Sequence, residues 1–403
     1  MLILRPLKHR PVVWIWGGQV LSAVGDEIHK VALVWLAAGL IGNNTGYLSA
    51  IQAASIFLFS LLGGAFADSW DHRRTMITAD ILRGLAVLAI PVSIAYIGPN
   101  LAVLAVASIV VSGLTAFFDP ALKGYLPQLV RERETLHAAN GLMETTGRLG
   151  RIFGPGIVGL INNAISVVHF FYLDALSFFV SAWAVSRAPH IPSEHRHEAQ
   201  GHSWASVTKG IWSGVDAIKG DRLVQFLTYT NGPVNASWYI VFPLTLGLYL
   251  HDKMPENIGA LGLIVSAYGV GNVLSNLVVA NFPLTNAVPW GFFGRILVGV
   301  GFLGLAVAPT LPWMMASAAL AATGGPMTDL SFLAVVQRSY DSRAISKIFR
   351  LNLTISYGIL LLVLLLSPKI FALYSYPAVI AASGATMALV GVIGFLLFWN
   401  VKR

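Results

Sequence analysis

Long apolar stretches alternate with short polar ones along this chain of 403 residues. A helix of about 20 apolar residues crosses the hydrocarbon core of a bilayer, so each stretch of that length is a candidate span. Gly, Pro and Asn separate many of the stretches, as in Gly98-Pro99-Asn100, because these residues favour turns. We therefore predict twelve transmembrane helices, at residues 12–40, 46–67, 75–97, 101–127, 138–162, 167–187, 223–250, 257–282, 289–308, 312–336, 347–372 and 377–400.

Composition indicates the same fold class, an all-α polytopic membrane protein. Hydrophobic residues make up 56% of the chain and charged residues 11%, against about 25% charged residues in soluble domains. A soluble protein of this size could not cover its surface with so few charges. The chain contains no cysteine, which excludes disulfide bonds and cysteine-ligated metal sites.

The distribution of basic residues predicts the orientation. Most of the 26 Lys and Arg residues fall in alternate loops and in the two terminal segments. Because Lys and Arg concentrate in cytoplasmic loops, we place both termini in the cytoplasm. The protein is then a multi-pass protein of the plasma membrane, the inner membrane of a bacterium. This asymmetry also accounts for the net charge of +8 without a nucleic-acid partner.

The longest connection between predicted helices lies at the middle of the chain. It covers residues 188–222 and separates a six-helix half at 1–187 from another at 223–403. Transporters are often built from two such halves. Apolar residues recur at helical spacing in the connection, which predicts an amphipathic helix on the inner membrane surface. The connection also holds four of the ten histidines, and both a metal- or pH-sensing role and no role are open for them.

Two motifs resemble those of a known family. The loop after the second predicted helix carries four residues that resemble the signature loop of the major facilitator superfamily: Gly64, Asp68, Arg73 and Arg74. The fifth predicted helix carries four that resemble the antiporter motif of exporters in that superfamily: Gly150, Gly154, Pro155 and Gly159. Stretches such as Gly18-Gln19, Phe118-Asp119-Pro120 and Asp174-Ala175 resemble the macrolide-efflux and enterobactin-exporter branch.

The resemblance implies the major facilitator fold, with two pseudo-symmetric halves that move a small molecule by alternating access. It also implies that the loop residues form a cytoplasmic latch, in which Arg73 and Arg74 hold carboxylates of the opposite half. The alternative is that these two arginines only set the topology. The glycines of the fifth helix allow close packing of a neighbouring helix in either case, and Pro155 removes a backbone donor there.

Ionisable side chains within the predicted spans give the strongest functional signal. Each costs about 2.5–3.5 kcal/mol at the centre of a membrane helix, so several in one chain usually line a pathway. We expect a mixed-charge cavity lined by Asp26, Glu27, Lys30, Asp119, Lys123, Arg148, Arg151, Asn231 and Asp329. Asp26 is the preferred proton-coupling residue, and a structural ion pair with Lys30 is its alternative role. Arg148 and Arg151 either anchor the end of their helix or bind an anionic substrate.

Two further positions are read from local sequence. Asn231-Gly232-Pro233 lies inside the seventh predicted helix, and Gly and Pro there predict a broken helix that faces the cavity. A plain packing kink is an equal alternative. Asp174 stands next to Ser177 on the sixth helix, and we interpret it as structural.

These observations predict a secondary active transporter that exports an amphiphilic small molecule, such as a drug or siderophore, in exchange for protons. The alternative is an importer or facilitator of an anionic metabolite, metal chelate or lysolipid. A membrane scaffold is disfavoured because it has no need for so many charges in its spans. We expect a monomer in the lipid bilayer, with no cofactor and no metal. The chain lacks a GxxxxGK[ST] phosphate loop and the HExxH and GxSxG motifs, so we do not expect an enzyme.

Overall fold

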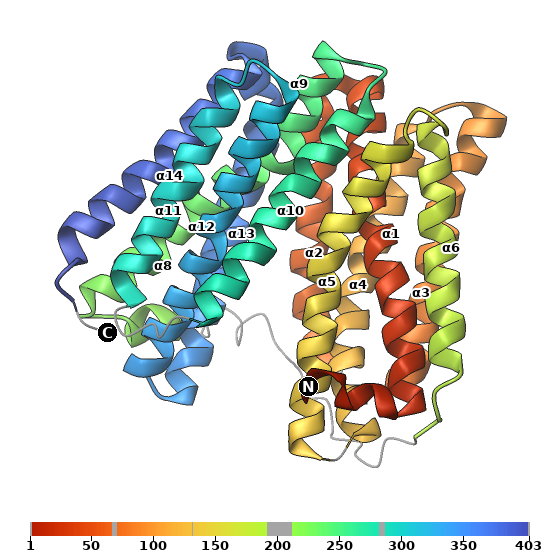
Figure 1. Cartoon of the computed structure of the whole chain (residues 1–403), viewed down its shortest axis with the longest axis horizontal. Helices are drawn as coiled ribbons and strands as arrows, with labels where there is room; N and C mark the ends of the chain where they lie inside the picture. The colour runs from red at the N-terminus through yellow and green to blue at the C-terminus, as the bar shows by residue number, and fades with distance from the viewer. Residues whose placement is uncertain (1, 67–70, 131, 192–211, 282–286, 402–403) are drawn as a thin grey trace. The chain divides into compact units, whose positions relative to one another are not determined.

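The computed structural model describes residues 2–66, 71–130, 132–191, 212–281 and 287–401 (Figure 1). All regular elements within these residues are helices. Their bounds are η1 Leu2–Lys8, α1 Arg10–Ile41, η2 Gly42–Asn44, α2 Thr45–Phe66, α3 His72–Ile97, α4 Leu101–Leu129, α5 Arg133–Ile161, α6 Val167–Ser186, α8 Arg222–Tyr239, η3 Ile240–Thr245, α9 Leu246–Lys253, α10 Ile258–Asn281, α11 Ala287–Ala306, α12 Leu311–Ser339, α13 Ser342–Leu373 and α14 Tyr376–Phe398.

Eight of these helices are long and apolar enough to cross a membrane. They are α3, α4, α6, α10, α11, α12, α13 and α14. Helices α1 and α5 are also long, but charged residues interrupt their apolar sequence. The total of twelve spans therefore stays a prediction.

The chain folds into two compact units. The first contains residues 1–42, 51–201 and 255–262, and the second contains 43–50, 202–254 and 263–403. Most of α2 thus belongs to the first unit, and most of α10 to the second. The proposed boundaries at 187 and 223 are not tested by this division.

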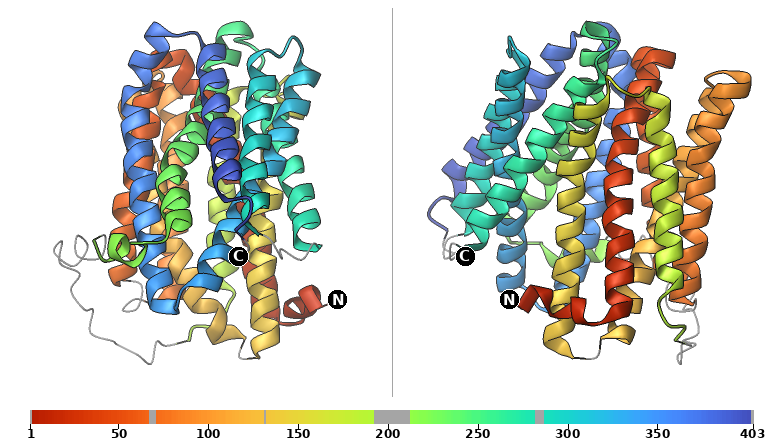
Figure 2. Two further views of the ribbon diagram at one scale, coloured as in Figure 1. Left: turned by 90° about the vertical axis from the view of Figure 1, so that its left-hand side faces the viewer. Right: turned by 45° about the vertical axis from the view of Figure 1, so that its right-hand side comes forward.

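The first unit is built around α1, which contacts several other helices. Helix α1 packs against α6 and α5, and α3 packs against α4 and α6 (Figures 1 and 2). An apolar cluster that includes Ile15, Met76 and Phe118 is fully buried among them. Burial of each such side chain stabilises the fold by about 1.5–3 kcal/mol relative to its exposure to water.

Glycines let α5 approach α1 closely. A Cβ atom at Gly154 would lie 2.7 Å from the carbonyl oxygen of Val24, and one at Gly150 would lie 2.7 Å from that of Ala23. Gly159 likewise lies close to α10, since a Cβ atom at Gly262 of that helix would lie 2.8 Å from the Gly159 nitrogen. Small residues at such contacts are the usual device of membrane helix pairs. Helix α5 continues through Pro155 to Ile161.

The second unit is centred on α11, which packs against α12 and α14, while α13 packs against α8. Residues 212–217 are helical, and Val215 and Ile218 pack into the apolar cluster of this unit. They are the described part of the predicted amphipathic helix. Residues 192–211, which hold the rest of it and three of the four histidines, lie outside the described residues.

The break in the seventh predicted helix lies elsewhere than expected. Helix α8 runs unbroken through Asn231-Gly232-Pro233, and the non-helical residue is Phe242 in η3, with φ −110° and ψ 121°. Gly232 instead allows close packing, because a Cβ there would lie 3.0 Å from Ile355 on α13. The prediction of a break at residues 231–233 is therefore wrong.

Candidate functional site

Helix α1 presents two polar faces. Ser22, Gly25 and His29 are buried and face α6, where a Cβ at Gly25 would lie 2.8 Å from a carboxylate oxygen of Asp174. Helical spacing places Lys30 outside this buried face, and its side chain is 56% exposed. The candidate site extends from the buried face to the exposed one.

His29 and Asp174 form a buried pair between α1 and α6. The His29 Nδ1 atom lies 3.0 Å from Asp174 Oδ2, and the two side chains are 5% and 0% exposed. The imidazole packs edge-on against Phe171, at 5.5 Å between ring centroids. Ser177 donates a hydrogen bond to the backbone carbonyl of Asp174. The interpretation of Asp174 as structural, beside Ser177, omitted its titratable neighbour His29 on α1.

A second buried pair lies on α3. Asp80 and Arg83, one helical turn apart, form an ion pair, and neither is more than 3% exposed. The Arg83 guanidinium lies 4.5 Å from the ring centroids of both Phe118 and Phe178, between α4 and α6. Cation–π contacts of this kind stabilise a desolvated guanidinium. Arg83 also donates to Thr115 at 3.4 Å.

The sequence prediction did not include this α3 pair. Its signal was nevertheless present, because an acidic and a basic residue stand three positions apart inside a long apolar span. Ser181 on α6 links the pair to α1, since it hydrogen-bonds to Asp80 and accepts a hydrogen bond from Gln19 at 2.9 Å. The polar interior of the first unit therefore joins α1, α3 and α6.

Asp26 lies at the border between the buried pairs and the exposed face. It is half-buried, and the charged groups that act on it are Asp174, Arg83, Lys30 and His29. The predicted alternative, a structural ion pair between Asp26 and Lys30, is not formed. Lys30 instead binds Glu27, with 2.7 Å between Nζ and Oε1.

The remaining predicted charges of the first unit gather on the exposed face. Arg151 lies 4.0 Å from Glu27. Asp119 and Lys123 are exposed on α4, and the charges of Lys123, Glu144 and Lys30 act on Asp119. Arg148, three residues before Arg151 on α5, is half-buried. The face thus carries carboxylates and basic groups in comparable number.

The second unit brings together fewer charges. Arg295 is 1% exposed and donates a hydrogen bond to Thr230 at 2.7 Å. The exposed carboxylate of Asp329 acts on it electrostatically. Asn231 donates to Asn352 on α13 at 3.1 Å, so its amide holds two helices together.

Aromatic side chains surround the break after α8. Trp238 donates a hydrogen bond to the Tyr268 hydroxyl at 2.7 Å, and the ring of Phe242 lies 4.8 Å from that of Tyr268. Tyr239 packs edge-on against Trp238, at 4.9 Å between centroids. We call Trp238, Tyr239, Phe242 and Tyr268 the aromatic cluster.

The predicted latch residues are described only in part. Asp68 lies outside the described residues, and only the place of Gly64 in α2 is described. Arg73 donates to the backbone carbonyls of Ser186 and Ala188, at 2.5 and 2.9 Å, and so closes the end of α6. Arg74 is 77% exposed and lies 3.8 Å from Asp71, the cap of α3. Of the two arginines expected to hold carboxylates, Arg73 binds carbonyls of its own unit.

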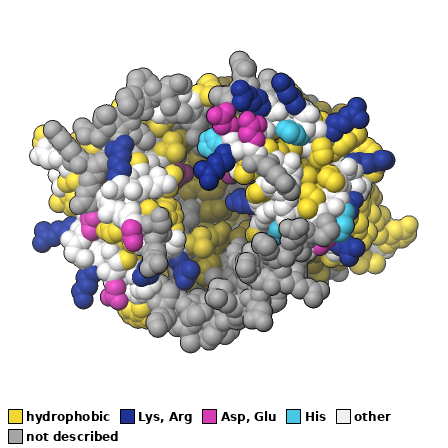
Figure 3. All heavy atoms as spheres, turned by 90° about the horizontal axis from the view of Figure 1, so that it is seen from below, with side chains coloured by type: hydrophobic (Ala, Val, Ile, Leu, Met, Phe, Trp, Pro, Cys, Tyr) yellow, Lys and Arg dark blue, Asp and Glu magenta, His cyan; other side chains and the backbone are white. Residues whose placement is uncertain are grey.

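Charges also gather at the ends of the helices, where Figure 3 shows Lys, Arg, Asp, Glu and His side chains together on one face. In the first unit, Arg5 binds Glu134 at 3.2 Å and His190 binds Asp71 at 3.2 Å. His190 is the one linker histidine that the structure describes. Among the described residues, no three His, Cys, Asp or Glu side chains are placed to hold a metal ion.

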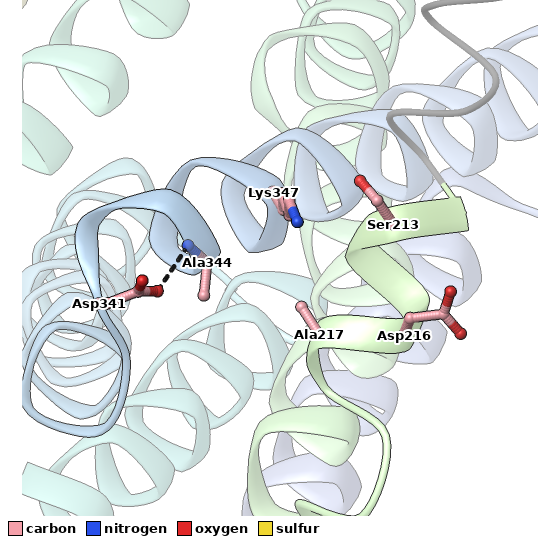
Figure 4. A pocket seen from close by; sticks show the side chains of 6 residues that line it. All are labelled: Ser213, Asp216, Ala217, Asp341, Ala344 and Lys347. Atoms are coloured by element: carbon pink, nitrogen blue, oxygen red, sulfur yellow. Dashed lines mark hydrogen bonds between the residues drawn. The ribbon is translucent and has the colours of Figure 1, made fainter.

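A polar pocket of about 470 Å³ lies in the second unit, between residues 213–217 and the start of α13 (Figure 4). Asp341 there accepts a hydrogen bond from the Ala344 backbone and caps α13. Lys347 lies between Asp341 and Ser213 in Figure 4. Asp341 is committed to the cap, and Asp216 and Lys347 are the other charged residues that line the pocket.

Comparison with known proteins identifies the family. The family model of the Major Facilitator Superfamily matches residues 15–347. The multidrug efflux pump Tap of Mycolicibacterium fortuitum is 28% identical over 338 residues, which cover 78% of this chain and 77% of the relative. The pump of the same name in Mycobacterium tuberculosis is 26% identical over 334 residues, covering 77% and 75%.

Solved structures share the fold. A crystal structure of the nucleoside transporter NupG gives a TM-score of 0.74 at 13% identity, covering 96% of this chain and 99% of the other. A POT family transporter in complex with 5-aminolevulinic acid gives a TM-score of 0.74 at 11% identity, covering 98% and 97%. At these identities the likeness concerns the fold alone.

Proposed function

Because the chain belongs to the Major Facilitator Superfamily, a superfamily of multi-pass transporters of small molecules, we propose that it exports amphiphilic, drug-like molecules in exchange for protons. The observation that carries this proposal is the position of Asp26. A titratable carboxylate stands half-buried between two buried polar pairs, His29–Asp174 and Asp80–Arg83, and an exposed face of mixed charge.

The exposed face of the first unit supports a pathway. Charged groups on α1, α4 and α5 would be costly against lipid. Lys30 and Arg151, within the long helices α1 and α5, are exposed on the outside of the unit, and both lie beside the half-buried Glu27. A water-accessible path along this face removes the cost, and it gives Asp26 access to protons and substrate.

The exchange follows from electrostatics. A proton on Asp26 removes one negative charge from the site, and loss of that proton restores it. A cationic or amphiphilic substrate is held by the carboxylate form and released by the protonated form. Protons that enter from outside therefore release substrate there, and the proton is returned after the site opens inward. Differential binding of this kind is what drives a conformational cycle.

The aromatic cluster of the second unit supports an amphiphilic substrate. Its rings offer apolar area and π faces for a lipophilic cation, and the Trp238–Tyr268 hydrogen bond fixes two of the rings. The two relatives described above are named multidrug efflux pumps, which agrees with this substrate class. A siderophore is the other amphiphilic candidate.

The rival proposal is import of an anionic metabolite, metal chelate or lysolipid by Lys123, Arg148 and Arg151. It is less favoured because Arg151 already lies beside Glu27, and Lys123 beside Asp119. We further propose twelve spans in two six-helix halves, both termini in the cytoplasm, a bacterial inner membrane and a monomer. The helix count rests on α1, α2, α5 and the interrupted α8–α9 segment crossing the bilayer beside the eight apolar spans.

The test is transport by purified protein in liposomes. We expect an imposed proton gradient to drive a fluorescent lipophilic cation against its concentration gradient, and we expect Asp26→Asn to abolish that accumulation while the protein stays folded. Glu256→Gln, at an exposed loop residue, is the matched control and should transport normally. Undiminished uphill transport by the Asp26→Asn protein would show that the coupling residue lies elsewhere. Gradient-independent uptake of anions by the unmodified protein would favour the rival.

A further inference from the structure

The buried interior behind Asp26 has more carboxylates than permanent cations. Asp80 and Asp174 are buried there and Asp26 stands half-buried at its edge. Arg83 is the one arginine or lysine that is buried in the described part of the first unit. With His29 neutral and all three carboxylates ionised, this group carries a net charge of −2. Uncompensated charge in a low-dielectric interior is costly, so the group retains a proton.

His29 is placed to hold such a proton. Its Nδ1 atom lies 3.0 Å from Asp174 Oδ2 and has no hydrogen-bond partner among the described residues. Neither carboxylate oxygen of Asp174 has a hydrogen-bond partner of good geometry there. A protonated imidazole would give this fully buried carboxylate its cationic partner, whereas a neutral imidazole leaves the carboxylate uncompensated.

We propose that the His29–Asp174 pair is a second proton-holding site that works with Asp26, so that His29 gains a proton when Asp26 is ionised. The inference rests on the proposed function and adds a residue to its coupling machinery. The group carries a net charge of −1 when His29 is neutral and Asp26 is protonated. It carries the same net charge of −1 when His29 is protonated and Asp26 is ionised. The interior thus keeps one proton while Asp26 changes its charge toward the substrate path.

The surroundings of His29 favour this exchange. From its own helix, Asp26, Glu27 and Lys30 are its charged neighbours. Asp174 comes from α6, and the Asp80–Arg83 pair comes from α3. Arg151 of α5 lies beside Glu27. Helix α4 contributes Asp119 and Lys123, on the exposed face and near Lys30. The cations Lys30 and Arg151 bind Glu27, and Lys30 also acts on Asp26, so the fully buried carboxylates of Asp80 and Asp174 are left to Arg83 and His29.

The first experiment compares the unmodified protein with His29→Gln, which keeps hydrogen-bonding capacity but cannot become charged. His169→Gln, at an exposed histidine on α6, is the matched control. Two readouts are used in liposomes: uphill transport of a lipophilic cation driven by a proton gradient, and exchange of the same cation without a gradient. We expect His29→Gln to lose the uphill transport and retain the exchange, and the control to retain both.

A purely structural contact between α1 and α6 predicts another result. Glutamine also offers Asp174 an N–H donor, so on that reading gradient-driven transport by His29→Gln would be unchanged, and that outcome overturns the inference. If the unmodified protein shows no gradient-driven transport, the proposed function fails instead. The two failures are therefore distinguishable.

A second measurement covers the case in which the variant does not fold. The unmodified protein labelled with ¹⁵N-histidine is titrated with the lipophilic cation at constant pH. We expect one imidazole to change its protonation signature when the cation binds, with Asp174→Asn removing that response. The inference is wrong if the cation binds and all ten imidazoles keep their signatures.

Discussion

The two units use buried charge differently. The first unit buries an arginine, two aspartates and a histidine at the contacts among α1, α3 and α6. The second unit, within its described residues, buries one charged side chain, Arg295, and its direct hydrogen-bond partner is the neutral Thr230. The contrast concerns the interior, because both units expose carboxylates, including Asp119 and Asp329.

This difference indicates a division of roles. The buried aspartates and histidine are concentrated in the first unit, and the second unit places aromatic rings around a helix break. In the proposed exporter, the first unit therefore sets the coupling to protons and the second contributes to the choice of substrate.

The units resemble one another in how their helices approach. Gly150 and Gly154 admit α1 in the first unit, and Gly299 and Gly384 bring α11 and α14 together in the second. Membrane helices gain little from apolar burial against lipid, so close van der Waals contact takes its place. Packing is thus common to both units, and charge distinguishes them.

The largest expected effect concerns the buried arginines. Arg83→Leu leaves Asp80 buried without its cation, and breaking a buried pair costs about 3–5 kcal/mol in the free energy of unfolding. Arg295→Leu leaves a neutral hydroxyl and an exposed carboxylate, and should cost about 1–3 kcal/mol. Thermal unfolding of the purified variants in detergent checks the order.

Arg74→Leu is the control for this comparison, since the exposed guanidinium should contribute no more than about 0.5 kcal/mol. Equal losses for Arg83 and Arg295 would contradict the difference between the units. Asp80→Leu combined with Arg83→Leu should recover part of the stability, because the pair is then removed as a whole.

A smaller effect tests the glycine contacts. Gly154→Ala places a methyl group 2.7 Å from Val24 and Glu27, and overpacking of this kind costs about 1–3 kcal/mol. Gly147→Ala is a matched control on the same helix, because a Cβ there meets nothing within 4 Å and helix propensity favours alanine by about 1 kcal/mol. The two variants should therefore move the unfolding temperature in opposite directions. A destabilised Gly147→Ala protein would show that another group covers this face of α5.

The smallest expected effect concerns substrate choice. Trp238→Phe removes the hydrogen bond to Tyr268, worth about 1 kcal/mol, and should raise the KM for bulky aromatic cations several-fold. Its dependence on the proton gradient should not change. Tyr229→Phe, at an exposed tyrosine on α8, is the control. A change in proton dependence for Trp238→Phe would remove the proposed division between the units.

Much of the architecture could be predicted from local sequence. The apolar stretches, the turn residues between them and the caps at Asp71, Asp221 and Asp341 depend on neighbours within a few positions, so one sequence determines them. The motif glycines of α5 were also correctly expected to admit a neighbouring helix. The break near residue 232 was wrongly placed because Gly and Pro are tolerated inside a helix when a neighbour packs on them.

The partners of the charged residues were not determined locally. The sequence by itself established that ionisable residues lie inside α1, α4 and α5, and that Lys30 could reach either Asp26 or Glu27. The tertiary structure decided that Lys30 binds Glu27 and that His29 meets Asp174 from another helix. It also decided that Asp80 and Arg83 are buried as a pair, with the Arg83 guanidinium against two phenylalanine rings. The physical reason is that helical spacing fixes which side chains share a face, whereas burial and pairing depend on which helix covers that face.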